Sequence, residues 1–265
     1  MTTPLVVLSV AATDSGGAAG LAADLATFAA LGAHGACAVT AVTAQDTTGV
    51  HRVVPLGADD VRAQLEAVLA DLPVAAAKAG MLASAAVARV VAEVLAGVVP
   101  LVVDPVLVST SGTRLGDEAL VAAYRDVLLP GADVVTPNRH EALALTGLTH
   151  RTTSEELAHA MHAFGPAVVL TGGDPGAGTC RDIVVRDGVT TVLEHPVVAT
   201  ANDHGTGCTY SAALAVHLAR GLALETAARR AQAFVARALV TSAPWELGRG
   251  RGPVAHVFAH PHQEN

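Results

Sequence analysis

The sequence predicts an α/β fold of three layers, in which helices cover both faces of a doubly wound, mostly parallel central sheet. Short apolar runs alternate along the chain with longer stretches of helical periodicity. The runs are apolar throughout rather than at every second residue, which is typical of strands buried on both faces of a parallel sheet. With 265 residues, 51% of them hydrophobic, the chain can fill one large core. We therefore expect a single domain over residues 1–265.

Six runs are predicted strands because they are short, apolar and flanked by helical patterns or turn residues. In chain order they cover residues 5–12, 37–44, 74–80, 101–106, 133–138 and 167–173. The helical patterns repeat apolar residues three or four positions apart, as Leu21, Leu25 and Phe28 do. They cover residues 20–31, 59–71, 84–96, 117–128, 153–164, 206–220 and 224–242.

Two weaker strand patterns, at 181–186 and 190–194, flank Asp187 and Gly188. An Asp-Gly pair between two strands is typical of a tight hairpin, so we expect a small antiparallel edge on the sheet. The tail, residues 249–265, is rich in Gly, Pro and His and is predicted to form a loop or to fray. Its three late histidines are interpreted as a solvated end rather than a metal site.

Charge and composition exclude several classes of protein. The net charge is −8, and there is no basic run that could follow a phosphate backbone, so nucleic acid is not an expected partner. No basic leader precedes the first strand and no uninterrupted apolar stretch could span a membrane, so membrane insertion and secretion are disfavoured. The wide spacing of Cys37, Cys180 and Cys208 argues against a disulfide framework or a structural zinc site. We therefore expect a cytoplasmic protein.

Ligands of open α/β sheets bind at the carboxyl ends of the strands, and several predicted strands end there in polar or otherwise unusual residues. These residues are 13–17 after the first strand, Gln45 and Asp46 after the second, 78–81 after the third, Asp104 in the fourth and 138–141 after the fifth. The candidate site is expected at this edge.

The tetrapeptide Gly205-Thr206-Gly207-Cys208 opens a predicted helix that ends at Gly221. The first amides of a helix lack partners within the helix, and glycines allow close approach, so this turn can hold an anion such as phosphate. A simple tight connection between strand and helix is the alternative. A cysteine in the first helical turn is favoured as a thiolate, which would lower its pKa, although a small buried hydrophobe has the same sequence signature. Neither a Walker loop nor a Rossmann fingerprint is present.

Asp24 lies on the same helical face as Leu21 and Phe28, so a buried carboxylate there needs a partner. The alternative is an acid in the first helical turn that is stabilised only by the helix dipole. Asn138 and Glu141 have the spacing of a helix capping box. Lys78 is the only lysine in the chain. It is interpreted either as a structural ion-pair residue or as a charge near the candidate site.

Six segments in a fixed order resemble the hydroxymethylpyrimidine and phosphomethylpyrimidine kinases of thiamine biosynthesis, within the ribokinase-like superfamily. They are ATDSGGAAGLAAD (12–24), TAVTAQDTTGV (40–50), KAGML (78–82), VVDPV (102–106), TPNRHEA (136–142) and DHGTGCTYSAALA (203–215). The resemblance covers nearly the whole chain. It implies a ribokinase-like fold, a homodimer, and transfer of a phosphoryl group from ATP to 4-amino-5-hydroxymethyl-2-methylpyrimidine, and in this family commonly to its monophosphate.

The resemblance also implies roles for individual residues. Gly205, Thr206 and Gly207 would form the anion hole around the transferred group, with Cys208 as the catalytic base. The residues implied in pyrimidine binding are Ala12, Asp24, Gln45, Met81, Val106 and Cys208. Those implied in ATP binding are Asn138, Glu141, Thr171, Gly173 and Thr206. Asp104 and Glu141 would hold Mg²⁺, mostly through water, which matches the preference of this ion for oxygen ligands and retained water.

The chain departs from the family pattern at several positions. Alanine stands at 12, 18 and 22, where the family has Gly, Gly and Gln, and the added methyl groups at 12 and 18 narrow the expected pocket floor. Asp46 and Asp203 replace the usual Asn and Thr. Thr171 stands where members commonly have a lysine that contacts ATP phosphates; Arg139 and Arg181 are the candidate substitutes.

Two alternatives therefore stay open beside the pyrimidine kinase. One is a pyridoxal or pyridoxine kinase with the same fold, and the other is a pyrimidine-binding protein without turnover. The sequence leaves open whether both phosphorylations occur, whether a monovalent cation such as K⁺ takes part, and which surface forms the dimer.

Overall fold

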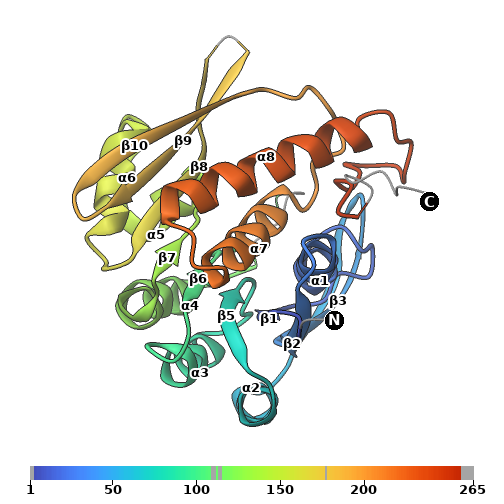
Figure 1. Ribbon diagram of the computed structural model, residues 1–265, viewed down its shortest axis with the longest axis vertical. Helices are drawn as coiled ribbons and strands as arrows, with labels where there is room; N and C mark the ends of the chain where they lie inside the picture. The colour runs from blue at the N-terminus through green and yellow to red at the C-terminus, as the bar shows by residue number, and fades with distance from the viewer. Residues whose placement is uncertain (1–2, 109–111, 113–114, 177, 258–265) are drawn as a thin grey trace.

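The computed structural model describes residues 3–108, 112, 115–176 and 178–257, with helices on both sides of a central sheet (Figure 1). Among these residues, the sheet has eight strands in the order β10-β9-β8-β7-β6-β5-β1-β2. Their bounds are β1 Val6–Ala11, β2 His34–Val39, β5 Val74–Ala79, β6 Leu101–Val103, β7 Val134–Val135, β8 Ala167–Gly176, β9 Thr179–Arg186 and β10 Val189–Pro196. In this spatial order, the six strands from β8 to β2 pair in parallel with their neighbours. Strand β9 is antiparallel to both β8 and β10. The predicted mostly parallel sheet with an antiparallel edge is confirmed.

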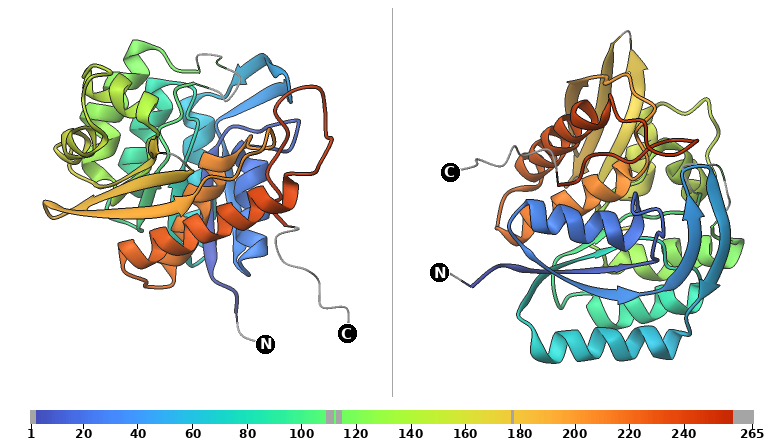
Figure 2. Two further views of the ribbon diagram at one scale, coloured as in Figure 1. Left: turned by 90° about the horizontal axis from the view of Figure 1, so that it is seen from above. Right: turned by 90° about the vertical axis from the view of Figure 1, so that its right-hand side faces the viewer.

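Two groups of helices cover the two faces of the sheet, and each encloses its own apolar cluster. Helices α1 (Gly20–Ala30), α7 (Thr206–Ala219) and α8 (Leu224–Ser242) lie on one face (Figure 2). The other face carries α2 Ala58–Asp71, α3 Ala85–Leu95, α4 Glu118–Ala123, η1 Tyr124–Leu128, η2 Leu129–Gly131, α5 Arg139–Thr146 and α6 Ser154–His162. No helix in the described part of the chain is long and apolar enough to cross a membrane.

The predicted second strand, 37–44, is wrong as a single element. The chain leaves the sheet after Val39, and β3 (Ala41–Asp46) pairs instead with β4 (Gly49–Pro55) in a separate two-stranded sheet that stands off the main body (Figure 2). Asp46 shapes the turn between them, because its Oδ1 accepts hydrogen bonds from the amides of Thr48 and Gly49. Exposed residues dominate β4, so it has no apolar run by which the sequence could have indicated it.

The predicted hairpin at Asp187 and Gly188 is confirmed, since both residues have positive φ, 52° and 75°, as a tight hairpin turn requires. In residues 249–257, the part of the tail that the structure describes, there is no helix or strand, but this part is not frayed. The amide of Gly252 donates to the Ala201 carbonyl, and the His204 amide donates to the Gly252 carbonyl. His256 is buried, and burial lowers its pKa to about 4, so it is not a solvated residue. The other two late histidines lie outside the described residues.

The order of strands places the topological switch between β1 and β5, because the chain moves outward to β2 on one side and to β6, β7 and β8 on the other. At such a switch the loops that follow neighbouring strands diverge and leave a crevice at the carboxyl ends. The polar residues that the sequence placed after these strands are thereby brought to one edge of the sheet.

Candidate active site

A cavity of about 150 Å³ lies at the carboxyl ends of the parallel strands. Its wall comes from the loops after β1, β5, β6 and β7, from β3 and β8, and from the start of α7. The predicted site residues that line it are Ala12, Gln45, Met81, Asp104, Val106, Asn138, Glu141, Thr171, Gly205, Gly207 and Cys208. Segments separated along the chain therefore meet around one space large enough to admit a ligand.

Two predicted site residues, Thr206 and Asp24, do not line this cavity, and Gly173 lies in β8. Thr206 turns its hydroxyl to the Asp203 carbonyl oxygen, 2.6 Å away, and so fixes the turn rather than the cavity wall. Gly173 belongs to β8 and is paired with Arg181 of β9. Asp24 is fully buried away from the cavity, as described below.

The glycine turn at the start of α7 packs directly against the loop that follows β1. Gly205 has φ 86°, and a Cβ there would lie 1.8 Å from the Ala18 carbonyl oxygen. Gly207 has no such neighbour, since a Cβ there would meet nothing within 4 Å. The turn is therefore tight on the side of Ala18 and open on the cavity side, where the first amides of α7 have no acceptors within the helix. This arrangement suits an anion.

We expect Gly205→Ala to lower the free energy of unfolding more than Gly221→Ala does. Gly221 also has positive φ, 77°, but a Cβ there would meet nothing within 4 Å, so its substitution costs only the backbone strain of about 1–2 kcal/mol. Gly205→Ala adds the clash with Ala18. Urea unfolding of both variants measures the difference, and equal losses would contradict this account of the turn.

The thiol of Cys208 lines the cavity, but the predicted lowering of its pKa is wrong. Burial raises the pKa of Cys208 to about 12, with Lys78 opposing the rise and Asp104 and Asp24 adding to it. The helix dipole that favoured a thiolate in the sequence argument is outweighed by loss of water and by two neighbouring carboxylates. The resting side chain is therefore a neutral thiol, and any work as a base depends on positive charge close to it.

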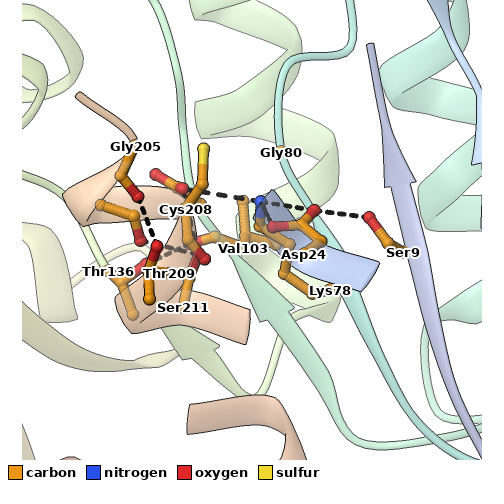
Figure 3. A network of polar contacts seen from close by, with 12 residues as sticks. Ser9, Asp24, Lys78, Gly80, Val103, Thr136, Gly205, Cys208, Thr209 and Ser211 are labelled. Carbon is orange, nitrogen blue, oxygen red and sulfur yellow. Dashed lines mark hydrogen bonds and ion pairs between the residues drawn. The ribbon is translucent and has the colours of Figure 1, made fainter. Parts of the chain in front are cut away.

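That positive charge is Lys78, which is completely buried between two carboxylates (Figure 3). Its Nζ lies 2.9 and 3.0 Å from the two carboxylate oxygens of Asp24 and 3.7 Å from Oδ2 of Asp104. Ser9 donates a further hydrogen bond to Asp24 at 2.5 Å. Burial lowers the pKa of Lys78, but Asp24, Cys208 and Asp104 together reverse this and raise it, so the ammonium stays charged.

The network corrects the expectation that Asp24 contacts a substrate. The sequence argument that a carboxylate on this helical face needs a partner holds, and the partner is Lys78 rather than a ligand. Both interpretations of Lys78 also apply together, because Lys78 is a buried ion-pair residue and reaches Asp104, which lines the cavity.

Asp104 and Glu141 bring two carboxylates to the same cavity. Glu141 completes the predicted capping box of α5: its Oε2 accepts from the Asn138 amide at 2.9 Å, and its own amide donates to Asn138 Oδ1. Burial, and then the negative charge of Asp104, raises the pKa of Glu141 well above its ordinary value. Two buried carboxylates that oppose each other's ionisation form an oxygen donor set that fits Mg²⁺, and the Ser211 hydroxyl orients one of them by donating to Asp104 Oδ2.

Among the cavity residues to which the sequence reasoning gave no individual role, Asp14 and His204 are titratable. Asp14 accepts hydrogen bonds from the amides of Gly16, Ala18 and Ala19 and thereby shapes the glycine-rich loop after β1. His204 Nε2 lies 2.8 Å from Gln45 Nε2 and 3.6 Å from Asp14.

Burial lowers the pKa of His204, although Asp14 opposes this, so its neutral ring can accept a hydrogen bond from the Gln45 amide. The resulting contact orients the side-chain amide of Gln45 at the cavity. Asp14 and His204 both lie in segments that carried the family resemblance, and those segments were the available signal.

Comparison with known proteins decides the family. The profile of the family described as phosphomethylpyrimidine kinase matches residues 14–255. This chain belongs to the phosphomethylpyrimidine kinase family. The predicted family, the predicted kinase class and the ribokinase-like fold are confirmed.

Similar proteins include the hydroxymethylpyrimidine/phosphomethylpyrimidine kinases of Synechococcus elongatus, 42% identical over 96% of this chain and 97% of that one, and of Streptomyces coelicolor, 43% identical over 97% and 96%. Among solved structures, pyridoxal kinase of Bacillus subtilis in an ADP complex has TM-score 0.87 at 32% identity, covering 96% of this chain and 98% of that one. Phosphomethylpyrimidine kinase of Clostridium difficile has TM-score 0.76 at 31% identity, covering 89% and 99%.

Thr171 marks where this kinase departs from the family pattern within the cavity. Neither candidate substitute for the family lysine lines the cavity. Arg139 is held by Ser154 and by the carbonyls of His150 and Thr152. The side chain of Arg181 on β9 points toward Glu155 and Glu194 and not into the cavity. Among the residues described around the cavity there is no lysine or arginine.

Proposed function

We propose that this kinase phosphorylates the hydroxymethyl group of 4-amino-5-hydroxymethyl-2-methylpyrimidine with ATP, and then phosphorylates the monophosphate, in the cytoplasm. The observation that carries the proposal is the convergence of Gln45, Cys208 and the glycine turn on one cavity. The curated relatives above, named for both activities, support it over nearly the full chain. Relatives from Oryza sativa and Geobacter sulfurreducens are named as bifunctional proteins of thiamine biosynthesis, at 43% and 40% identity.

The cavity offers two chemically different sets of groups for the two reactants. Met81 and Val106 supply apolar surface for the faces of a flat ring, and the Gln45 amide, held by His204, can pair with polar atoms on its edge. The amides at the start of α7 can hold a phosphoryl group. Cys208 lines the same cavity and is the proposed neighbour of the hydroxymethyl group.

The proposed transfer forms a bond between the hydroxymethyl oxygen and the γ-phosphorus. The bond from that phosphorus to the oxygen bridging to the β-phosphorus breaks, and ADP leaves. The resting thiol of Cys208 first gives its proton to solvent, and the ammonium of Lys78 is the fixed charge that favours the thiolate. The hydroxyl proton then passes to this sulfur. Mg²⁺ bound by Asp104 and Glu141 would neutralise phosphate charge. Amide donors aimed at the moving group supply much of the stabilisation in such reactions.

One coupled assay tests the proposal. ADP release is measured with Mg-ATP and either hydroxymethylpyrimidine, its phosphate, or pyridoxal. We expect release with both pyrimidines, which the proposal requires. Release with pyridoxal alone would replace the proposal by a pyridoxal kinase. Calorimetric binding of the pyrimidine without ADP release would replace it by a binding protein.

A pyridoxal kinase is the second candidate because a specific comparison favours it. Pyridoxal kinase from Staphylococcus aureus, solved in complex with pyridoxal, has TM-score 0.86 at 33% identity over 97% of this chain. Ala12, which lines the cavity in place of the family's glycine, alters the floor on which the ring rests. The higher identity to pyrimidine kinases keeps the pyrimidine as the proposed substrate.

Thr171→Lys is expected to lower the KM for ATP by roughly 10- to 100-fold, since a charge-assisted hydrogen bond contributes about 1.5–3 kcal/mol. The reason is that Thr171 lines the cavity without offering a cation to phosphate. Thr171→Met is the matched control, because it adds similar length without charge. Steady-state kinetics at saturating pyrimidine measure both variants, and an equal KM in the two would show that charge at this position does not bind ATP.

A further inference from the structure

Three metal-binding side chains meet on one face of the antiparallel edge, away from the candidate active site. Cys180 and Asp182 are two residues apart on β9 and therefore point to the same face of the sheet. His195 of β10 is paired directly opposite Cys180. The face is the one covered by α8, since Gln232 of that helix donates to Asp182 (Figure 1).

The donor atoms of these residues are close enough to share an ion. One ligand atom from each of Cys180, Asp182 and His195 lies within 4.8 Å of the other two. Asp182 Oδ2 and His195 Nε2 are 4.0 Å apart, too far for a hydrogen bond but suited to a metal between them. The distance from Zn²⁺ to such a ligand atom is about 2.0–2.3 Å, so a central ion can contact all three after small side-chain adjustments.

The groups around the cluster already orient these donors. Asp182 Oδ1 accepts from the Gly172 amide at 2.9 Å and Oδ2 from Gln232 Nε2 at 2.9 Å. His195 Nδ1 lies 3.2 Å from the carbonyl oxygen of Pro196; with its proton there, Nε2 keeps a free lone pair toward Asp182. Hydrogen bonds of this kind to the ligands fix metal sites in other proteins.

The charges around the cluster leave room for a cation. Asp182 is buried beside Cys180 and His195. The adjacent Arg181 does not neutralise either group, because its side chain lies on the other face with Glu155 and Glu194. Two acidic donors thus face each other with only the half-buried imidazole of His195 as a basic neighbour among the described ion pairs.

We propose that Cys180, Asp182 and His195 bind one divalent transition-metal ion of the Zn²⁺ class, with water in the fourth position. A thiolate and an imidazole select such an ion over Mg²⁺ and Ca²⁺, which prefer oxygen donors. The site differs from the proposed Mg²⁺ site in its donor set and its position. It joins β9 to β10. The cysteine spacing gave no sign of it, because the hairpin at Asp187 and Gly188, and not the sequence interval, brings His195 to Cys180.

Cobalt binding to the full-length apoprotein tests the proposal. Titration with Co²⁺ is expected to give a thiolate-to-cobalt charge-transfer absorption that saturates at one equivalent and disappears when Zn²⁺ is added. Cys180→Ser is expected to abolish the band. Cys37→Ser, which changes another partly buried cysteine, and Cys208→Ser, which removes the thiol in the cavity, are expected to keep it. A band that survives Cys180→Ser, or no band in the unchanged protein, would overturn the proposal.

Two further variants separate metal binding from folding. His195 is 25% exposed in its side chain, so His195→Gln is expected to fold as the parent does, checked by circular dichroism, yet to lose the cobalt band. Gln232→Leu removes the orienting hydrogen bond to Asp182, together with a longer one to the Leu193 carbonyl oxygen, and is expected to weaken Co²⁺ binding by about 10- to 100-fold. Unchanged affinity in both variants would also overturn the site. None of these readouts depends on kinase activity.

Discussion

Replacing Cys208 by alanine is expected to lower kcat by about 10²- to 10⁴-fold, the usual loss when a positioned general base is removed. Pyrimidine binding should change little, because Gln45, Met81 and Val106 remain at the cavity. Turnover is followed by ADP release and binding by calorimetry. An unchanged kcat would remove the thiol from the mechanism.

The control for this variant is Cys37→Ala, which removes a partly buried cysteine of β2 outside the cavity. It is expected to keep the parent kcat. If both cysteine variants lost turnover and also lacked the thermal unfolding transition of the parent, the loss would come from misfolding. A loss confined to Cys208→Ala, with an unchanged transition, assigns it to the reaction.

Lys78→Met is expected to lower the free energy of unfolding by about 3–5 kcal/mol, the cost of leaving a buried charge without its partner. Asp24 is completely buried, and Lys78 supplies hydrogen bonds to both of its carboxylate oxygens. Methionine fills much of the same volume, so lost packing contributes little. Urea unfolding at neutral pH measures the change.

The double variant Asp24→Leu/Lys78→Met is the matching control. With both charges replaced by apolar side chains, most of the stability should return, because the desolvation penalty of Asp24 is removed. Ser9 then loses its acceptor, so recovery is expected to be incomplete. A double variant no more stable than Lys78→Met would show that the loss does not come from the unpaired carboxylate.

The layers of the fold could be predicted from the sequence because burial on both sides of the sheet leaves runs that are apolar except for a single buried polar residue, as at Val6–Ala11 with Ser9 and Val74–Ala79 with Lys78. The pair β3 and β4 could not, because exposed strands that pair only with each other carry no such run. Helix α5 was missed as a helix although its capping box at Asn138 was recognised, since it is only eight residues long.

At the site, the order of segments and the family resemblance located the residues that line the cavity with main-chain atoms, such as Gly205 and Gly207. They failed where the outcome depends on what a side chain meets in three dimensions. Asp24 was assigned to a ligand because nothing in the sequence shows that Lys78 lies beside it. The pKa of Cys208 was expected to fall because helix position is visible in a sequence and burial beside Asp104 is not.

The close approach of Gly205 to Ala18 has a consequence for exchanging loops between members of this family. The two segments touch through main-chain atoms, so neither can change course without moving the other. A chimera that imports a relative's 203–208 turn should import its 12–20 loop as well, and libraries aimed at new acceptor alcohols should vary both segments as one unit.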